Sequence, residues 1–213
     1  MKNLLSNSRH ILAAVFLLGG VDVAAAAVVV TFSGQVTDVG AFGASPPAGV
    51  SVGNTVSGTV KYSTAGATVI EVGPSERAYI FQPGFGNEIT ITIGTNVWKT
   101  DLQSVSLCDD AFGGDYLDYL GTSLVTATFP GNLGSGLLGL DYSDSETPYD
   151  LLNGHDLTNA PEDIGFAAAQ VKAGSVSSSD GVNIWAIQFD VDSQTVPVQS
   201  LTWGEIKALY ARP

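Results

Sequence analysis

One short segment of the chain gathers carboxylates around a pair of glycines. Its acidic residues are Asp109, Asp110, Asp115 and Asp118, on either side of Gly113–Gly114. Calcium in proteins takes about six to eight hard oxygens, often from aspartates and loop carbonyls. We therefore predict an acidic loop whose four carboxylates could bind calcium. Neither an EF-hand pattern nor a calcium-binding nonapeptide repeat accompanies the segment, so a solvated acidic loop without metal is the alternative.

Groups for acid–base or nucleophilic catalysis are scarce. His155 is the one histidine that follows the N-terminal segment, and a zinc site would need several histidines or cysteines. Glycoside hydrolysis needs two carboxylates about 5 to 10 Å apart, and among 21 Asp and Glu residues no pair stands out. We assign no catalytic residue, and the sequence favours a non-enzymatic role over that of an enzyme.

The charge of the chain excludes some partners and leaves others open. Eight Lys and Arg against 21 Asp and Glu give a net charge of −13, which repels nucleic acid and anionic membrane surfaces. A glycan is easier to accommodate, because sugars bind to aromatic faces and polar loop groups. The aromatic candidates are Trp98, Tyr116, Tyr119, Tyr142 and Tyr149. Of these, we expect Trp98 to fill the core instead.

The elements that must position these residues are short β-strands. Residues 28–37, 55–62, 88–93 and 183–191 alternate apolar and polar side chains with period two, which is typical of half-buried strands. The predicted core positions are Val30, Phe32 and Val36, then Val56, Val60 and Tyr62, and finally Trp185, Ile187, Phe189 and Val191. Residues 94–96 predict a tight turn of a hairpin. This pattern predicts an all-β fold, an antiparallel β-sandwich of jelly-roll-like type.

The remaining segments predict turn-rich connections between the strands and a single short helix. Glycine, proline and serine mark turn-rich connections over 43–53, 130–136 and 175–181, and residues 164–172 predict one short helix. The lone cysteine, Cys108, follows an alternating stretch. We expect it to be a small buried apolar side chain and not a reactive thiol.

Residues 1–26 have the composition of a secretory signal peptide. Lys2 and Arg9 flank a polar start, an apolar stretch covers 11–18, and small residues lead to a cleavage site near Ala25–Ala26. The apolar stretch is shorter than the roughly 20 residues that cross a bilayer. We therefore expect a secreted mature chain with no transmembrane span, whose β-domain covers 27–198.

The C-terminal segment, residues 199–213, predicts a short helical tail. Thr202 and Glu205 form a capping box, and the side chains of Trp203, Ile206 and Tyr210 share one helical face. The segment is either a helix docked against the domain or a sorting or docking tag.

Several strand-like motifs point to a group of bacterial proteins. Residues 57–63, 78–81 and 187–190 resemble exported β-rich bacterial proteins, of uncharacterised activity, that often carry a C-terminal sorting signal of the PEP-CTERM kind. The resemblance implies a role at the cell surface or with exopolysaccharide. The end of this chain departs from that pattern, because it has no Pro-Glu-Pro motif and no membrane span.

Taken with the composition, these features predict a secreted, non-enzymatic β-sandwich with a structural or ligand-binding role at the bacterial cell surface or extracellular matrix. The expected partner is a glycan or the matrix itself. No cofactor is required, and calcium is the ion that the acidic segment would suit. The alternative is a secreted hydrolase that acts on polysaccharide.

Overall fold

A computed structural model describes residues 27–64, 67–73, 76–111, 114–124, 129–143, 157 and 169–196; at residues 72, 109–111, 114–120 and 122–124 the description covers the backbone alone. All regular structure in these ranges is β-strand. No helix in the described ranges has the length and apolar character needed to cross a membrane. The predicted signal peptide, the helical tail with Trp203, Ile206 and Tyr210, and His155 lie outside the described residues.

The described chain folds into ten antiparallel strands, which confirms the predicted all-β, antiparallel class. The strands are β1 (Val28–Phe42), β2 (Thr55–Tyr62), β3 (Thr68–Gly73), β4 (Glu76–Ile80), β5 (Glu88–Ile93), β6 (Asn96–Ala111), β7 (Gly114–Leu124), β8 (Ser135–Ser143), β9 (Val171–Ser179) and β10 (Ile184–Thr195). The predicted hairpin at residues 94–96 is confirmed, since Gly94 and Thr95 alone separate β5 from β6 and Gly94 has a φ of 61°.

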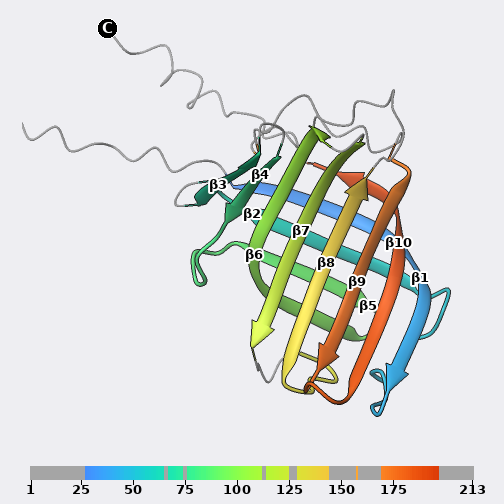
Figure 1. Cartoon of the computed structure of the whole chain (residues 1–213). Helices are drawn as coiled ribbons and strands as arrows, with labels where there is room; N and C mark the ends of the chain where they lie inside the picture. The colour runs from blue at the N-terminus through green and yellow to red at the C-terminus, as the bar shows by residue number, and fades with distance from the viewer. Residues whose placement is uncertain are drawn as a thin grey trace, which may run out of the picture.

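All ten strands belong to one sheet that curls back on itself. Its order is β3-β4-β6-β5-β2-β1-β10-β9-β8-β7, and β7 also pairs with β6. The long strand β6 makes this closure possible, because its first half pairs with β5 while its second half lies between β4 and β7. Seen in Figure 1, β6 to β10 run side by side in front, β2 and β5 cross behind them, and β1 passes from behind to the edge beside β10.

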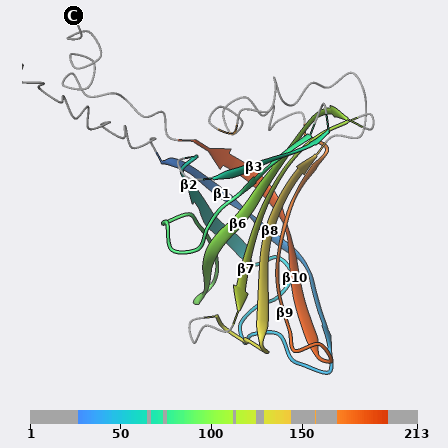
Figure 2. The ribbon, with the colours of Figure 1, turned by 60° about the vertical axis from the view of Figure 1, so that its left-hand side comes forward.

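The hydrophobic core lies between these two layers of the curled sheet, whose curvature is clearest in Figure 2. The core positions predicted on β1, β2 and β10 are confirmed, as is the burial of Trp98. Facing strands meet through aromatic contacts: the rings of Phe32 and Phe189 stack with centroids 6.1 Å apart, and those of Trp98 and Trp185 lie 6.2 Å apart. Strict alternation places these large side chains on one face of each strand, so both layers contribute to a single core.

The two buried tryptophans also hold the connection between β7 and β8. Trp98 donates its indole N–H to the carbonyl oxygen of Pro130 at 3.0 Å, and Trp185 donates to that of Gly131 at 2.6 Å. The ring of Phe129 packs on Trp185 with centroids 6.3 Å apart. Since buried indole N–H groups need an acceptor, these bonds and the packing of Phe129 together fix the path of the turn.

Glycines let the backbones of neighbouring strands and aromatic rings approach closely. The similar segments Ser33-Gly34 and Ser57-Gly58 lie on paired strands, with Ser33 opposite Ser57. A Cβ atom on Gly58 would overlap the ring of Phe32, which lies across the strand. A Cβ atom on Gly34 would overlap the carbonyl oxygen of Asp190 on β10. Both positions require a residue without a side chain because the space is already occupied.

Two predicted connections and one predicted helix are wrong where the structure describes them. The acidic segment at residues 108–118 is not a loop, because it forms the end of β6 and the start of β7, which pair with each other. Residues 175–181 are mostly strand β9, and the predicted helix over 164–172 is contradicted where it is described, at residues 171 and 172. Strand preference depends on the neighbouring strands more than on the residue types themselves. Here glycine and serine are accommodated on β9 because the ring of Phe189 packs over Gly174.

The turn between β9 and β10 supplies a prediction about pH. The carboxylate of Asp180 accepts hydrogen bonds from the backbone N–H groups of Val182 and Asn183 at 2.9 and 2.7 Å, and from the Asn183 side chain at 2.8 Å. The bonds from Asn183 are the main cause that lowers the pKa of Asp180 to about 2, below its ordinary value of 3.8. Since these bonds favour the ionised form, they stabilise the fold above pH 4 and are lost as the pH falls toward 2.

We therefore expect Asp180→Ala to lower the thermal midpoint at pH 7 and to have progressively less effect between pH 4 and pH 2. Thermal unfolding of the wild-type protein and of Asp180→Ala across this range gives the difference between their midpoints at each pH. The other carboxylates are the same in both proteins, so their titration does not contribute to this difference. Asp192→Ala, at an exposed carboxylate on β10 that accepts none of these bonds, is the matched control. A difference for Asp180→Ala that stayed constant down to pH 2 would contradict the assigned role of its charge.

Candidate functional site

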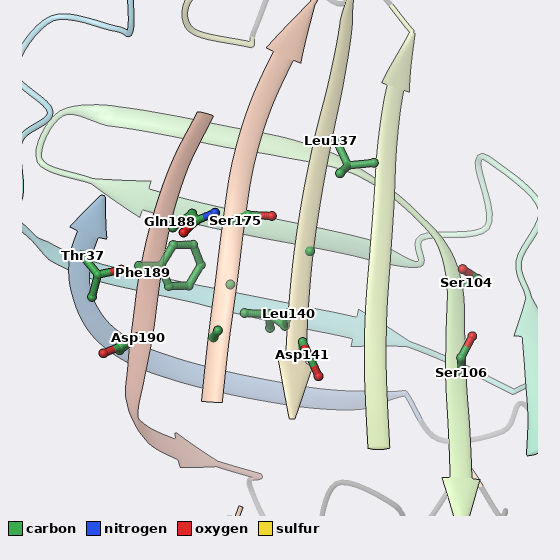
Figure 3. Close-up of a pocket in the computed structure, with 13 residues that line it drawn as sticks. Thr37, Ser104, Ser106, Leu137, Leu140, Asp141, Ser175, Gln188, Phe189 and Asp190 are labelled. Carbon is green, nitrogen blue, oxygen red and sulfur yellow. The ribbon is translucent and has the colours of Figure 1, made fainter. Parts of the chain in front are cut away.

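A groove on the outer surface of the front layer is the best candidate for a functional site. It has a volume of about 540 Å³ and is lined by residues of β6, β8, β9 and β10 together with Thr37 of β1 (Figure 3). Its polar lining residues on these strands include Ser104, Ser106, Asp141, Ser175, Gln188 and Asp190. Sites that bind small molecules are typically concave and carry a few convergent polar groups.

The groove is hollow because small side chains occupy the outward positions in its middle. On β8 and β9 the inward side chains Leu138, Leu140 and Val176 are buried. The alternating outward positions carry Gly139, Ala173 and Ser175 in this region. In an antiparallel sheet, residues opposite one another share a face. Because the outward residues in the middle of this face are short and those around them are longer, they leave a depression over the sheet.

The register of the strands arranges the polar groups in two rows. In one row, Gly139 pairs with Ser175, and Ser175 pairs with Gln188. In the other row, Asp141 pairs with Ala173, and Ala173 pairs with Asp190. The two carboxylates therefore lie on either side of a small apolar residue. Because neighbouring strands are about 4.8 Å apart, the backbones of Asp141 and Asp190 are separated by about 10 Å.

The floor of the groove rests on rigid packing. Gly174 faces inward between two outward lining residues, and a Cβ atom there would overlap the ring of Phe189 and lie 2.8 Å from Leu140 Cδ2. Phe189 in turn stacks on Phe32 of the other layer. A ligand would thus meet a surface supported by close-packed core residues.

The chemistry of the lining is that of hydrogen bonding and negative charge. Serine and threonine hydroxyls both donate and accept, Gln188 supplies an amide, and Asp141 and Asp190 supply acceptors. None of the lining residues whose side chains the structure describes is Lys, Arg or His. In the part of the chain that the structure describes, the ion pairs join Arg77 to Glu71 and Lys99 to Glu88, at sites away from the groove. The arrangement suits a neutral or cationic ligand that is rich in hydroxyl groups.

Comparison with family models, with curated proteins and with solved structures finds no match to this chain.

The four aspartates predicted to bind calcium lie on paired strands and not in a flexible loop. Asp109 and Asp110 are at the end of β6, and Asp115 and Asp118 are in β7. The register places Asp118 opposite Ser106 on one side and opposite Asp141 on the other. Among the side chains that are described, no three carboxylate, histidine or cysteine groups come together as a metal site. The four predicted ligands are described by their backbone alone, so calcium binding stays a prediction.

The other predicted residues have clearer outcomes. Cys108 is buried, which confirms its interpretation as a small apolar side chain. Trp98 and Tyr142 are fully buried and offer no face to a glycan, and burial raises the pKa of the Tyr142 hydroxyl. Tyr149 lies outside the described residues.

The groove residues themselves were not recognised from the sequence. A signal was present, because serine recurs at alternate positions in residues 104–106 and 175–179. The sequence also contains a Gly-x-Ser-x-Gly pattern at residues 49–53. In the structure it forms the turn between β1 and β2, where the N–H of Ser51 donates to Asn54 Oδ1 at 2.8 Å. A nucleophile elbow needs a strand followed by a helix, so this serine is not a catalytic candidate.

Proposed function

We propose that this chain is a secreted, non-enzymatic protein that binds a glycan in the outer groove, at the bacterial cell surface or in the extracellular matrix. We include in the proposal that its two layers form a sandwich of jelly-roll-like type. The observation that carries the proposal is the groove of about 540 Å³, with serine, threonine, glutamine and aspartate side chains over a rigid floor.

The chemistry of a glycan fits this lining. Sugar hydroxyls both donate and accept hydrogen bonds, and so do the hydroxyls of Thr37, Ser104, Ser106 and Ser175. The groove extends from β6 to β1 across the intervening strands. With about 4.8 Å between strands, that distance is about 20 Å or more, which suits an extended oligosaccharide better than a single sugar.

The predicted export of the chain is consistent with the same proposal. The signal-like residues 1–26 and the acidic composition are those expected of a chain that works outside the cytoplasm. A net charge of −13 argues against nucleic acid and anionic membranes as partners. Calcium bound near the β6–β7 hairpin would be compatible with this role but is not required for it.

A larger side chain that fills the groove should weaken the binding of a glycan. We expect Ser175→Leu to weaken the affinity for a bound polysaccharide at least about tenfold, equivalent to about 1.4 kcal/mol, because the new side chain occupies the floor. Ser177→Leu is the matched control, because Ser177 lies on the same strand at the next outward position and does not line the groove. Affinity electrophoresis through a panel of soluble neutral, basic and acidic polysaccharides measures both variants. The proposal would be overturned if no polysaccharide of the panel retarded the wild-type protein. It would also be overturned if the two variants lost affinity to the same extent.

A polysaccharide hydrolase is the second candidate, and one observation favours it. Asp141 and Asp190 face the same groove with backbones about 10 Å apart. Inverting glycosidases place two carboxyl groups about 6.5 to 9.5 Å apart. Release of reducing ends from polysaccharides by the wild-type protein, lost in Asp141→Asn and Asp190→Asn while binding persists, would establish this activity and refute the non-enzymatic role.

A further inference from the structure

We infer that the groove selects glycans that carry free amino groups, such as oligomers of 2-amino-2-deoxyhexoses, over neutral and acidic glycans. This inference rests on the proposed function, since it concerns the ligand class of the same groove. It is carried by the placement of Asp141 and Asp190 in the lining and by the lack of a cation among the lining side chains that the structure describes.

The two carboxylates are placed to meet one ligand. Asp141 on β8 and Asp190 on β10 are in the same row of the register, with Ala173 of β9 between them. Both side chains line the groove, where Figure 3 shows them on either side of β9. The methyl group of Ala173 leaves the space between them open. A ligand that lies along this row can therefore contact both carboxylates at once.

Cations of the protein do not neutralise this row in the described part of the chain. The described cationic side chains belong to Lys61, Arg77, Lys99 and Lys172. Arg77 and Lys99 pair with Glu71 and Glu88, and Lys61 lies on β2 in the opposite layer. Lys172 precedes Ala173 on β9, so alternation directs its side chain to the other face of the strand. None of the four lines the groove.

The electrostatic consequence is selection by charge. A concave surface lined by one sign of charge concentrates the field and raises the local concentration of opposite charges. An ammonium group bound to a carboxylate forms a charge-assisted hydrogen bond, which is stronger than a bond between neutral groups. An acetylated amine offers only a neutral donor, and a uronic acid would be repelled. The neighbouring hydroxyls of Ser106 and Ser175 remain to bind the sugar hydroxyls.

The experiment compares a fully deacetylated glucosamine oligomer with its N-acetylated form of the same length, by calorimetry on the full mature chain. We expect the deacetylated oligomer to bind the wild-type protein about tenfold more tightly or better. The preference should weaken as ionic strength rises from about 0.05 M to about 0.5 M, because added salt screens exposed charges. In Asp141→Asn/Asp190→Asn the two oligomers should bind alike. These conservative changes at solvent-facing positions leave the core untouched, and a thermal midpoint for each variant checks its folding.

Asp101→Asn separates selection by the groove from general attraction to an acidic protein. Asp101 is exposed on β6 outside the groove lining, and its replacement removes one unit of charge, as each of the single changes Asp141→Asn and Asp190→Asn does. We expect it to retain the full preference. The inference would be overturned if the two oligomers bound equally to the wild-type protein. It would also be overturned if Asp101→Asn lost the preference to the same extent as the changes at Asp141 and Asp190. If the inference were overturned in this way but Ser175→Leu abolished the binding of the acetylated oligomer, the proposed glycan-binding function would still hold without the preference for amino groups. If neither oligomer nor any polysaccharide of the panel bound, the proposed function itself would fall.

Discussion

Replacing Trp185 with alanine should lower the free energy of unfolding by about 3–5 kcal/mol, the range for a large aromatic side chain removed from a core. The side chain is fully buried, and its ring contacts those of Trp98 and Phe129. Its removal leaves a cavity between the two layers. It also leaves the carbonyl oxygen of Gly131 without the indole donor. Urea denaturation followed by the fluorescence of the remaining tryptophans measures the change.

Two further variants divide this effect into its causes. Trp185→Phe retains most of the ring and removes the N–H group, so we expect a loss of about 1–3 kcal/mol from the unsatisfied acceptor and the smaller ring. Phe42→Ala is the control for removing an aromatic residue that is 72% exposed, and it should change stability by less than about 0.5 kcal/mol. If Trp185→Ala behaved like Phe42→Ala, the packing between the two layers would have to be different from that described.

The second large effect is expected at Gly34, where β1 lies tightly against the backbone of β10. A Cβ atom there would overlap the carbonyl oxygen of Asp190 and lie 2.8 Å from its carbonyl carbon. Backbone atoms cannot rotate away as a side chain can, so Gly34→Ala must displace β10. We expect a loss of about 3 kcal/mol, at the upper end of the range for overpacking. The displacement would also move the Asp190 wall of the groove, so affinity for the ligand should fall as well.

Gly40→Ala is the matched control on the same strand. The nearest atom to a Cβ at that position is Asp38 Oδ2, at 3.8 Å, which is an ordinary contact. We expect a change within about 0.5 kcal/mol and unaltered ligand binding. Equal stability of the two variants in urea denaturation would show that β1 and β10 are not in the contact described.

Local pattern accounts for the strands that were predicted correctly. Period-two alternation identified the core faces of β1, β2 and β10 because a half-buried strand must place every second side chain in the core. The hairpin at Gly94–Thr95 was predicted because a two-residue turn with positive φ favours glycine. Neither inference depends on distant parts of the chain.

The errors occurred where distant segments decide the conformation. Residues 108–118 look like a loop because aspartate and glycine are poor strand formers. They become strands because β6 and β7 pair with each other and, through β4 and β8, with the rest of the curled sheet. Strand β9 is poor in large side chains for a related reason, since the ring of Phe189 from β10 takes the space over Gly174.

Alternation and composition were thus enough to establish an antiparallel β-protein, its principal core residues and its acidic character. These properties follow from the residue types and their nearest neighbours along the chain. The groove depends on strand order and register, because Ser104, Asp141, Ser175 and Asp190 come from four different strands, of which β6 is far from β9 and β10 in sequence. Side chains on one face of a sheet become neighbours through hydrogen bonds between strands, and a shift of the register by one residue would turn each of them to the opposite face.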